Sequence, residues 1–205
     1  MTLVSEPLAL PSPAPPTPRH ALLVATFLAI AVGTVLMGGL LAGYFEARHA
    51  VLAANKRWGP ANPGDLPNVG LAVSYAALLL SAGTAQWALR AIKDDERRHT
   101  ALAIGVTLLL GAAFVNGLSF CYTQLGLRAG DDGFANQIYA VTATHLVLVL
   151  VAMGFFAVMG FRVLGGQFGP RNAEFVASAT AFWHFVVVTG FAVWWSLWFL
   201  LGGPN

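Results

Sequence analysis

The stretch ALLVATFLAIAVGTVLMGGLLAGYF, residues 21–45, contains no charged side chain and decides the class of fold. A bilayer core about 30 Å thick is crossed by roughly 20 apolar residues in an α-helix. Only helices and closed barrels satisfy their backbone hydrogen bonds in hydrocarbon, and barrel strands would alternate apolar with polar residues. The stretch therefore predicts a transmembrane helix.

Four similar apolar blocks follow in the 205-residue chain, separated by short polar connections. Charged residues make up 10% of the sequence, against about 25% in soluble domains. We predict an all-α integral membrane bundle of five transmembrane helices that forms one domain over residues 21–205. The predicted spans are residues 21–47, 67–92, 100–124, 136–164 and 173–201.

Residues 1–20 form a different kind of segment, with six prolines between Pro7 and Pro18. Proline lacks the backbone N–H of a helix and favours extended chain. The segment also has no basic start, so it is not typical of a signal peptide. We predict a tail that is disordered or lies on the surface.

The distribution of Lys and Arg among the connections predicts the orientation. Seven of these residues fall on the side that holds the N-terminus, and four fall on the opposite side. Because cytoplasmic loops are enriched in positive charge, the N-terminus is predicted to be cytoplasmic.

Gly39 and Gly43 form a GxxxG spacing in the first span. Small residues four apart allow another helix to approach closely in lipid. The spacing favours packing within the same chain, and a seam for a partner subunit is the alternative interpretation. In either case Gly39 and Gly43 are the predicted packing residues.

The middles of the spans contain no Asp, Glu, Lys or Arg, which argues against an autonomous pump. Gln86, Asn116 and His145 are predicted to be buried polar residues. His145 and His184 could be imagined as ligands of one haem. Their predicted depths differ by roughly 12 Å along the helix axes, which disfavours that interpretation.

No motif for a nucleotide, a metal or nucleophilic catalysis is present, and the single Cys121 excludes a disulfide framework. The formal net charge of +2 does not indicate a nucleic-acid partner. We therefore predict no catalytic residue and no cofactor or metal bound by this chain.

Several segments in register resemble subunit III of the haem–copper cytochrome c oxidases. FWHFV at 182–186 is similar to the family's WHFVD motif, and GLLAGYFEAR at 39–48 is similar to the end of its first retained helix. YAVTATH at 139–145 is similar to YxxTGFHxxH, and FR at 161–162 matches the pair that closes that helix. Gln86 also fits. The closest form is the five-helix version found in actinobacteria, and this resemblance implies the plasma (inner) membrane of a bacterium.

The sequence departs from the family at its polar positions. Two family glutamates fall at Gly33 and Cys121, a histidine falls at Leu148, and an aspartate falls at Val187. The chain is therefore identified as a divergent member. These losses count against a role in proton uptake. Helix packing, lipid binding and subunit docking remain as the roles that the resemblance implies.

The resemblance implies a non-catalytic accessory subunit of the respiratory chain, which stabilises an oxidase catalytic subunit and binds phospholipid. Arg162, Trp183 and His184 are the residues implied in lipid binding, and haem and copper are expected in the partner subunits. A subunit of a nitric oxide reductase-type complex is one alternative. A transporter or channel for a neutral solute is another, with Gln86, Asn116 and Thr142 along its path.

Overall fold

The computed structural model describes residues 20–59, 67–128, 130, 132–167, 169 and 173–196. They form five α-helices, each long and apolar enough to cross a membrane, which confirms the predicted fold class. The helices are α1 (Ala21–Ala53), α2 (Asn68–Lys93), α3 (Arg97–Leu125), α4 (Gly133–Leu164) and α5 (Ala173–Trp194).

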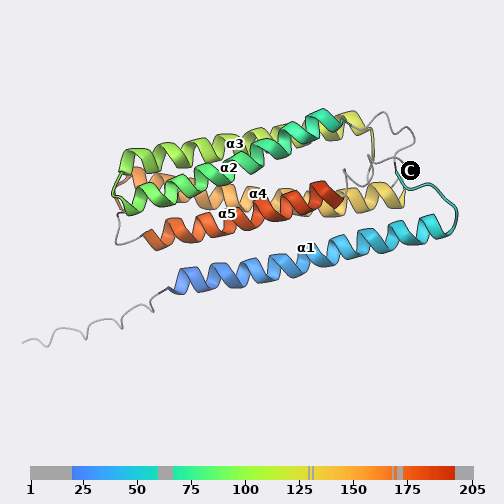
Figure 1. Ribbon diagram of the computed structural model, residues 1–205, viewed down its shortest axis with the longest axis horizontal. Helices are drawn as coiled ribbons and strands as arrows, with labels where there is room; N and C mark the ends of the chain where they lie inside the picture. Colours follow the sequence, from blue (N-terminus) through green and yellow to red (C-terminus); the bar gives the residue numbers. More distant parts are fainter. Residues whose placement is uncertain are drawn as a thin grey trace, which may run out of the picture.

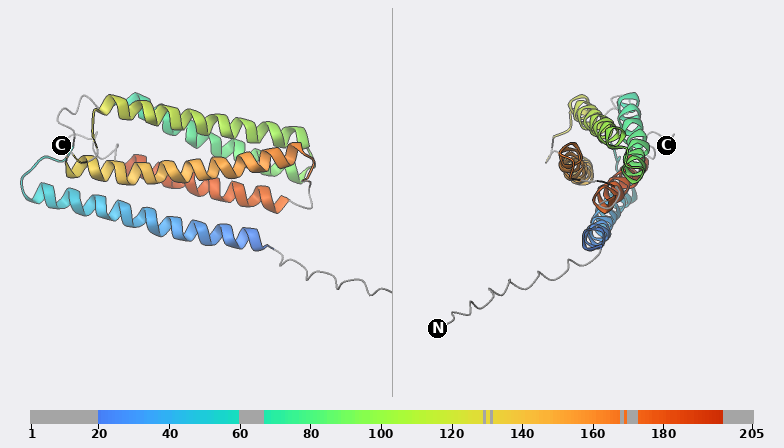
Figure 2. Two further views of the ribbon diagram at one scale, coloured as in Figure 1. Left: turned by 180° about the vertical axis from the view of Figure 1, so that it is seen from behind. Right: turned by 90° about the vertical axis from the view of Figure 1, so that its left-hand side faces the viewer.

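The helices lie side by side along the long axis of the molecule (Figure 1). Helix α1 runs along one side, α2 and α3 along the other, and α4 and α5 lie between them, as the end-on view also shows (Figure 2). Helix α5 packs against α1, α2 and α4, whereas α1 packs against α5 and α4. The centre of the bundle is therefore built around α5.

Successive helices run in opposite directions, so the connections gather at two ends of the bundle. One end holds the short connection between α2 and α3 and the starts of α1 and α5, and we call it the α2–α3 end. The opposite end holds the connection between α1 and α2 and is called the α1–α2 end. These names carry no statement about which end faces the cytoplasm.

The helix ends differ from the predicted spans. Helix α1 continues to Ala53, six residues past the predicted end, because Ala50, Leu52 and Ala53 are good helix formers. Helix α4 begins earlier, at Gly133, where the Asp132 carboxylate accepts a hydrogen bond from the Ala135 N–H at 2.6 Å. Residues 197–201 of the fifth predicted span and residues 1–19 of the predicted tail lie outside the described residues.

Trp183 of α5 is the largest fully buried side chain of the bundle. Its indole N–H donates to the Ser81 hydroxyl of α2 at 2.8 Å, and its ring meets Phe156 of α4 edge-on at 5.2 Å. One residue thus joins three helices, and its only polar group is hydrogen-bonded, as burial requires.

At the α2–α3 end, Arg97 closes the C-terminus of α4. Its Nε donates to the Val163 carbonyl at 2.7 Å, and its guanidinium also donates to the Leu164 carbonyl. The last carbonyls of a helix lack the usual partners within it, and here the Gly166 N–H also donates to the Val163 carbonyl at 3.0 Å. A cation is favourable at a helix C-terminus. The contact therefore fixes the start of α3 against the end of α4.

Candidate lipid-binding groove and docking faces

An apolar groove of about 290 Å³ lies between α1 and the pair α4 and α5. The hydroxyl of Thr26, its one polar side-chain group, donates to the Leu22 carbonyl of its own helix at 2.9 Å. The groove therefore presents a surface that suits a hydrocarbon chain. Its lining residues are Leu22, Ala25, Thr26, Ala29, Val151, Phe155 and Phe182.

Arg162 places a cation beyond this groove toward the α2–α3 end. It follows Phe155 by seven residues, so it lies on the same face of α4 about 10 Å further along the axis. Its Nε donates to the Gln167 side-chain oxygen at 3.0 Å, and its guanidinium lies 5.3 Å from the centre of the Phe175 ring. The half-buried side chain is thus held in place by two neighbours.

The other two residues implied in lipid binding are placed differently. Trp183 has no exposed surface, so a lipid contact does not fit its burial in this structure. His184 is half-buried, and its Nδ1 donates to the Thr180 carbonyl at 2.7 Å. Their neighbour Phe182 lines the groove instead. Sequence reasoning missed Phe182 as a groove residue, although its position next to Trp183 in the FWHFV segment could have indicated it.

The three polar residues predicted to be buried have three different environments. His145 is fully buried, and its Nε2 donates to the Val186 carbonyl of α5 at 2.9 Å. Gln86 is half-buried. Asn116 was predicted to be buried, but the structure places it on an exposed face of α3. None of the five described helices covers that face.

The residues proposed for a solute path do not come together. Thr142 is fully buried and accepts a hydrogen bond from the Tyr122 hydroxyl, whereas Asn116 faces outward. The two histidines considered for haem each bind a different backbone carbonyl. In the described part of the chain, no group of three or more His, Cys, Asp or Glu residues could hold a metal ion.

The glycine pair of α1 faces away from the bundle. Gly39 and Gly43 are exposed, and a Cβ atom at either position would meet nothing within 4 Å. The hypothesis that the pair packs within this chain is therefore wrong. The alternative, a seam for a partner subunit, stays a prediction.

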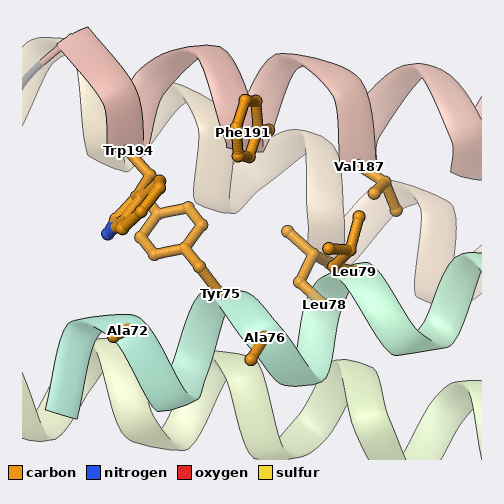
Figure 3. Close-up of a pocket in the computed structure, with 8 residues that line it drawn as sticks. All are labelled: Ala72, Tyr75, Ala76, Leu78, Leu79, Val187, Phe191 and Trp194. Atoms are coloured by element: carbon orange, nitrogen blue, oxygen red, sulfur yellow. The ribbon is translucent and has the colours of Figure 1, made fainter. Parts of the chain in front are cut away.

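A second apolar groove, of about 230 Å³, lies between α2 and α5 toward the α1–α2 end (Figure 3). In Figure 3 the rings of Tyr75 and Trp194 lie against each other, with centroids 6.4 Å apart. The described residues that line this groove are all uncharged. It is an apolar surface for lipid chains or for another helix.

Apolar packing fills the positions where the family's polar residues are missing. A Cβ atom at Gly33 would lie 2.7 Å from Cζ of Phe185, so the present packing has no room for a glutamate there. Cys121 and Val187 are both buried among apolar neighbours. The packing of the bundle therefore matches the small or apolar residues that replace the family's polar ones.

A bundle of five helices that are each long and apolar enough to cross a bilayer is a multi-pass membrane protein. Residues 17–201 match the family model of cytochrome c oxidase subunit III. The chain belongs to that family, which confirms the resemblance found in the sequence.

Known relatives agree with the family. The chain is 27% identical over 183 residues to a probable cytochrome c oxidase subunit 3 of Nocardia farcinica, covering 83% of this chain and 88% of that protein. It is 28% identical over 157 residues to the probable subunit 3 of Rickettsia bellii, covering 73% and 53%. The chain thus spans about half the length of the Rickettsia relative.

Proposed function

We propose that this chain is a non-catalytic accessory subunit of a haem–copper terminal oxidase in aerobic respiratory electron transport. It packs against the catalytic subunit, stabilises that subunit and binds structural phospholipid. The family match over residues 17–201 carries the proposal. Haem and copper belong to the partner subunits in this proposal, and the N-terminus faces the cytoplasm.

The first test is a pull-down of the tagged full chain in a gentle detergent, with a visible spectrum and mass spectrometry of the eluate. We expect haem bands together with an oxidase catalytic subunit. A nitric oxide reductase-type chain in the eluate would assign the subunit to that complex instead. A colourless, solitary chain would contradict the proposal.

A deletion strain tests the stabilising role. Without this chain, the oxidase is expected to start at a near-normal rate and to lose activity faster during turnover. An oxidase whose lifetime is unchanged by the deletion counts against stabilisation while leaving membership of the complex intact.

The groove between α1, α4 and α5 is the proposed phospholipid site. An acyl chain fits its apolar lining, and in this proposal the lipid phosphate pairs with the cation of Arg162. Native mass spectrometry of Arg162→Gln should show fewer bound phospholipids than wild type. Lys93→Gln removes an exposed cation at the same end of the bundle but outside the groove. Equal lipid loss in both variants would remove this assignment.

The exposed glycine pair of α1 is the proposed contact with the catalytic subunit, because small residues permit a close helix approach. Gly39→Leu and Gly43→Leu should reduce the haem that co-purifies with the chain. Gly83→Leu is the matched control, since Gly83 on α2 is also exposed with nothing within 4 Å of a Cβ atom. Retention of haem by all three variants would place the contact elsewhere.

A further inference from the structure

The exposed position of Asn116 needs a partner. Among the described residues, Asn116 is the one carboxamide that is exposed near the middle of a helix. It lies five residues from the midpoint of α3, about 7.5 Å along the axis, and therefore inside a hydrocarbon core about 30 Å thick. A carboxamide that faces lipid chains there leaves its donors and its acceptor without hydrogen bonds, which is unfavourable.

Asn116 is part of a regular line of residues along α3. The line is Gly105, Leu109, Ala112, Asn116, Ser119 and Thr123, with spacings that alternate between four and three. This is the spacing of a heptad seam, which keeps one face of a helix against a partner in a left-handed crossing. We call these six residues the α3 seam.

The composition of the α3 seam suits a close approach. Every second residue is small (Gly105, Ala112 and Ser119), and a Cβ atom at Gly105 would meet nothing within 4 Å. The hydroxyls of Ser119 and Thr123 donate to carbonyls of α3 itself, at 2.8 and 2.7 Å. Asn116 is then the polar group of the seam that an outside partner would satisfy.

The chemistry of the seam favours a second copy of the same helix. All copies of a chain insert in the same orientation, so their α3 helices are parallel, and a two-fold axis along the membrane normal brings each seam against itself. In that arrangement Asn116 faces Asn116 of the other copy. A carboxamide is both donor and acceptor and can satisfy its equal, as Asn does at matching core positions of parallel two-stranded coiled coils.

We propose that the α3 seam is a homotypic interface through which two copies of this chain associate in the membrane, with the Asn116 carboxamides hydrogen-bonded across the two-fold axis. Helix α3 lies on the opposite side of the bundle from α1, the helix proposed to contact the catalytic subunit (Figure 2). The proposal goes beyond the accessory function and does not depend on it.

Disulfide trapping of the full chain in native membranes tests the geometry. Facing seam residues of a parallel pair come close enough for a disulfide, so Ser119→Cys should give an oxidant-dependent band at twice the chain mass. Ala143→Cys is the control, because Ala143 is exposed on α4 outside the seam. The native Cys121 is buried, and a Cys121→Ser background removes its contribution.

A Ser119→Cys band no stronger than that of Ala143→Cys overturns the proposal. A cross-link to a different chain also overturns the proposal and shows that the α3 seam contacts that chain instead.

Energy transfer between labelled full-length chains in phosphatidylcholine vesicles tests the role of Asn116. Asn116→Leu should weaken self-association about tenfold, and Asn116→Gln should restore part of it. Thr34→Leu is the matched control, since Thr34 is an exposed polar residue of α1 outside the seam. A wild-type chain that stays monomeric, or a dimer indifferent to Asn116→Leu, overturns the interface.

Discussion

Helices α5 and α1 are both apolar and both long enough to span a membrane, but they have opposite surroundings. In an apolar 18-residue window, 61% of α5 is buried inside the protein and 17% of α1 is buried. Most of α1 is not covered by the other described helices, so its side chains gain little from contact within this chain. Helix α5 is therefore held by close packing and interhelical hydrogen bonds, whereas α1 has few such contacts with the rest of the chain.

The largest expected difference between the two helices comes from their aromatic side chains. Trp183→Ala on α5 removes a fully buried ring, and large-to-small core changes of this size cost about 3–5 kcal/mol. Phe27→Ala on α1 removes a ring that is 56% exposed, and we expect less than about 1 kcal/mol. Reversible unfolding in mixed micelles measures the loss in unfolding free energy of both variants. Equal losses would mean that α1 is packed as tightly as α5.

Glycine substitutions sharpen the comparison at the level of single contacts. A Cβ atom at Gly190 of α5 would lie 2.8 Å from the Leu78 side chain and 2.9 Å from the His145 ring. Gly190→Leu should therefore destabilise the isolated chain by about 1–3 kcal/mol through overpacking. Gly39→Leu on α1 meets open space and should leave the same unfolding midpoint nearly unchanged. A destabilised Gly39→Leu chain would show that α1 has a neighbour on that face.

The sequence was sufficient for the five spans, because span length and apolar content are set by the thickness of the bilayer. It was not sufficient for the faces of the helices. Asn116 was predicted to be buried and is exposed, and Gly39 was expected to pack inside the chain and faces outward. Lipid and protein interior are both apolar, so hydrophobic periodicity does not separate a lipid-facing side from a protein-facing side as it does in water.

The candidate site shows the same limit. Arg162 stands out in the sequence because it is a cation at a helix end, and its place near a groove follows from helix order. Phe182 and Phe155 line the groove, but in the sequence they are two of 14 phenylalanines. Which of these rings reaches the groove depends on the rotation of each helix about its axis, and that rotation is set by contacts such as Gly33 with Phe185.

A hydrogen bond gives a smaller test of the same contrast. Ser81→Ala removes the acceptor of the Trp183 indole, and interhelical hydrogen bonds in membranes contribute about 0.6 kcal/mol on average. Thr34→Ala on α1 removes a hydroxyl that bonds only to the Ile30 carbonyl of its own helix, and no interhelical loss follows. Unfolding of the two variants under the same conditions gives the difference. The reverse ranking would refute the view that α5 is the helix held by polar contacts.

The smallest expected effect concerns the ion pair that joins the two helices. His20 Nδ1 lies 3.3 Å from the Glu174 carboxylate, which places the start of α1 beside the first turn of α5. The contact is an ion pair only when the His20 imidazole is protonated. It is partly exposed, and such pairs contribute about 0–1 kcal/mol and weaken with salt. Glu174→Gln should therefore leave global unfolding almost unchanged and increase hydrogen exchange in the first turns of α1 at low salt. Glu96→Gln is the control, because its partner His99 lies on α3 and not on α1. If hydrogen exchange in the first turns of α1 does not respond to Glu174→Gln, the contact with Glu174 does not hold the start of α1. The close packing of Phe185 against Gly33 is then sufficient to hold α1 on α5.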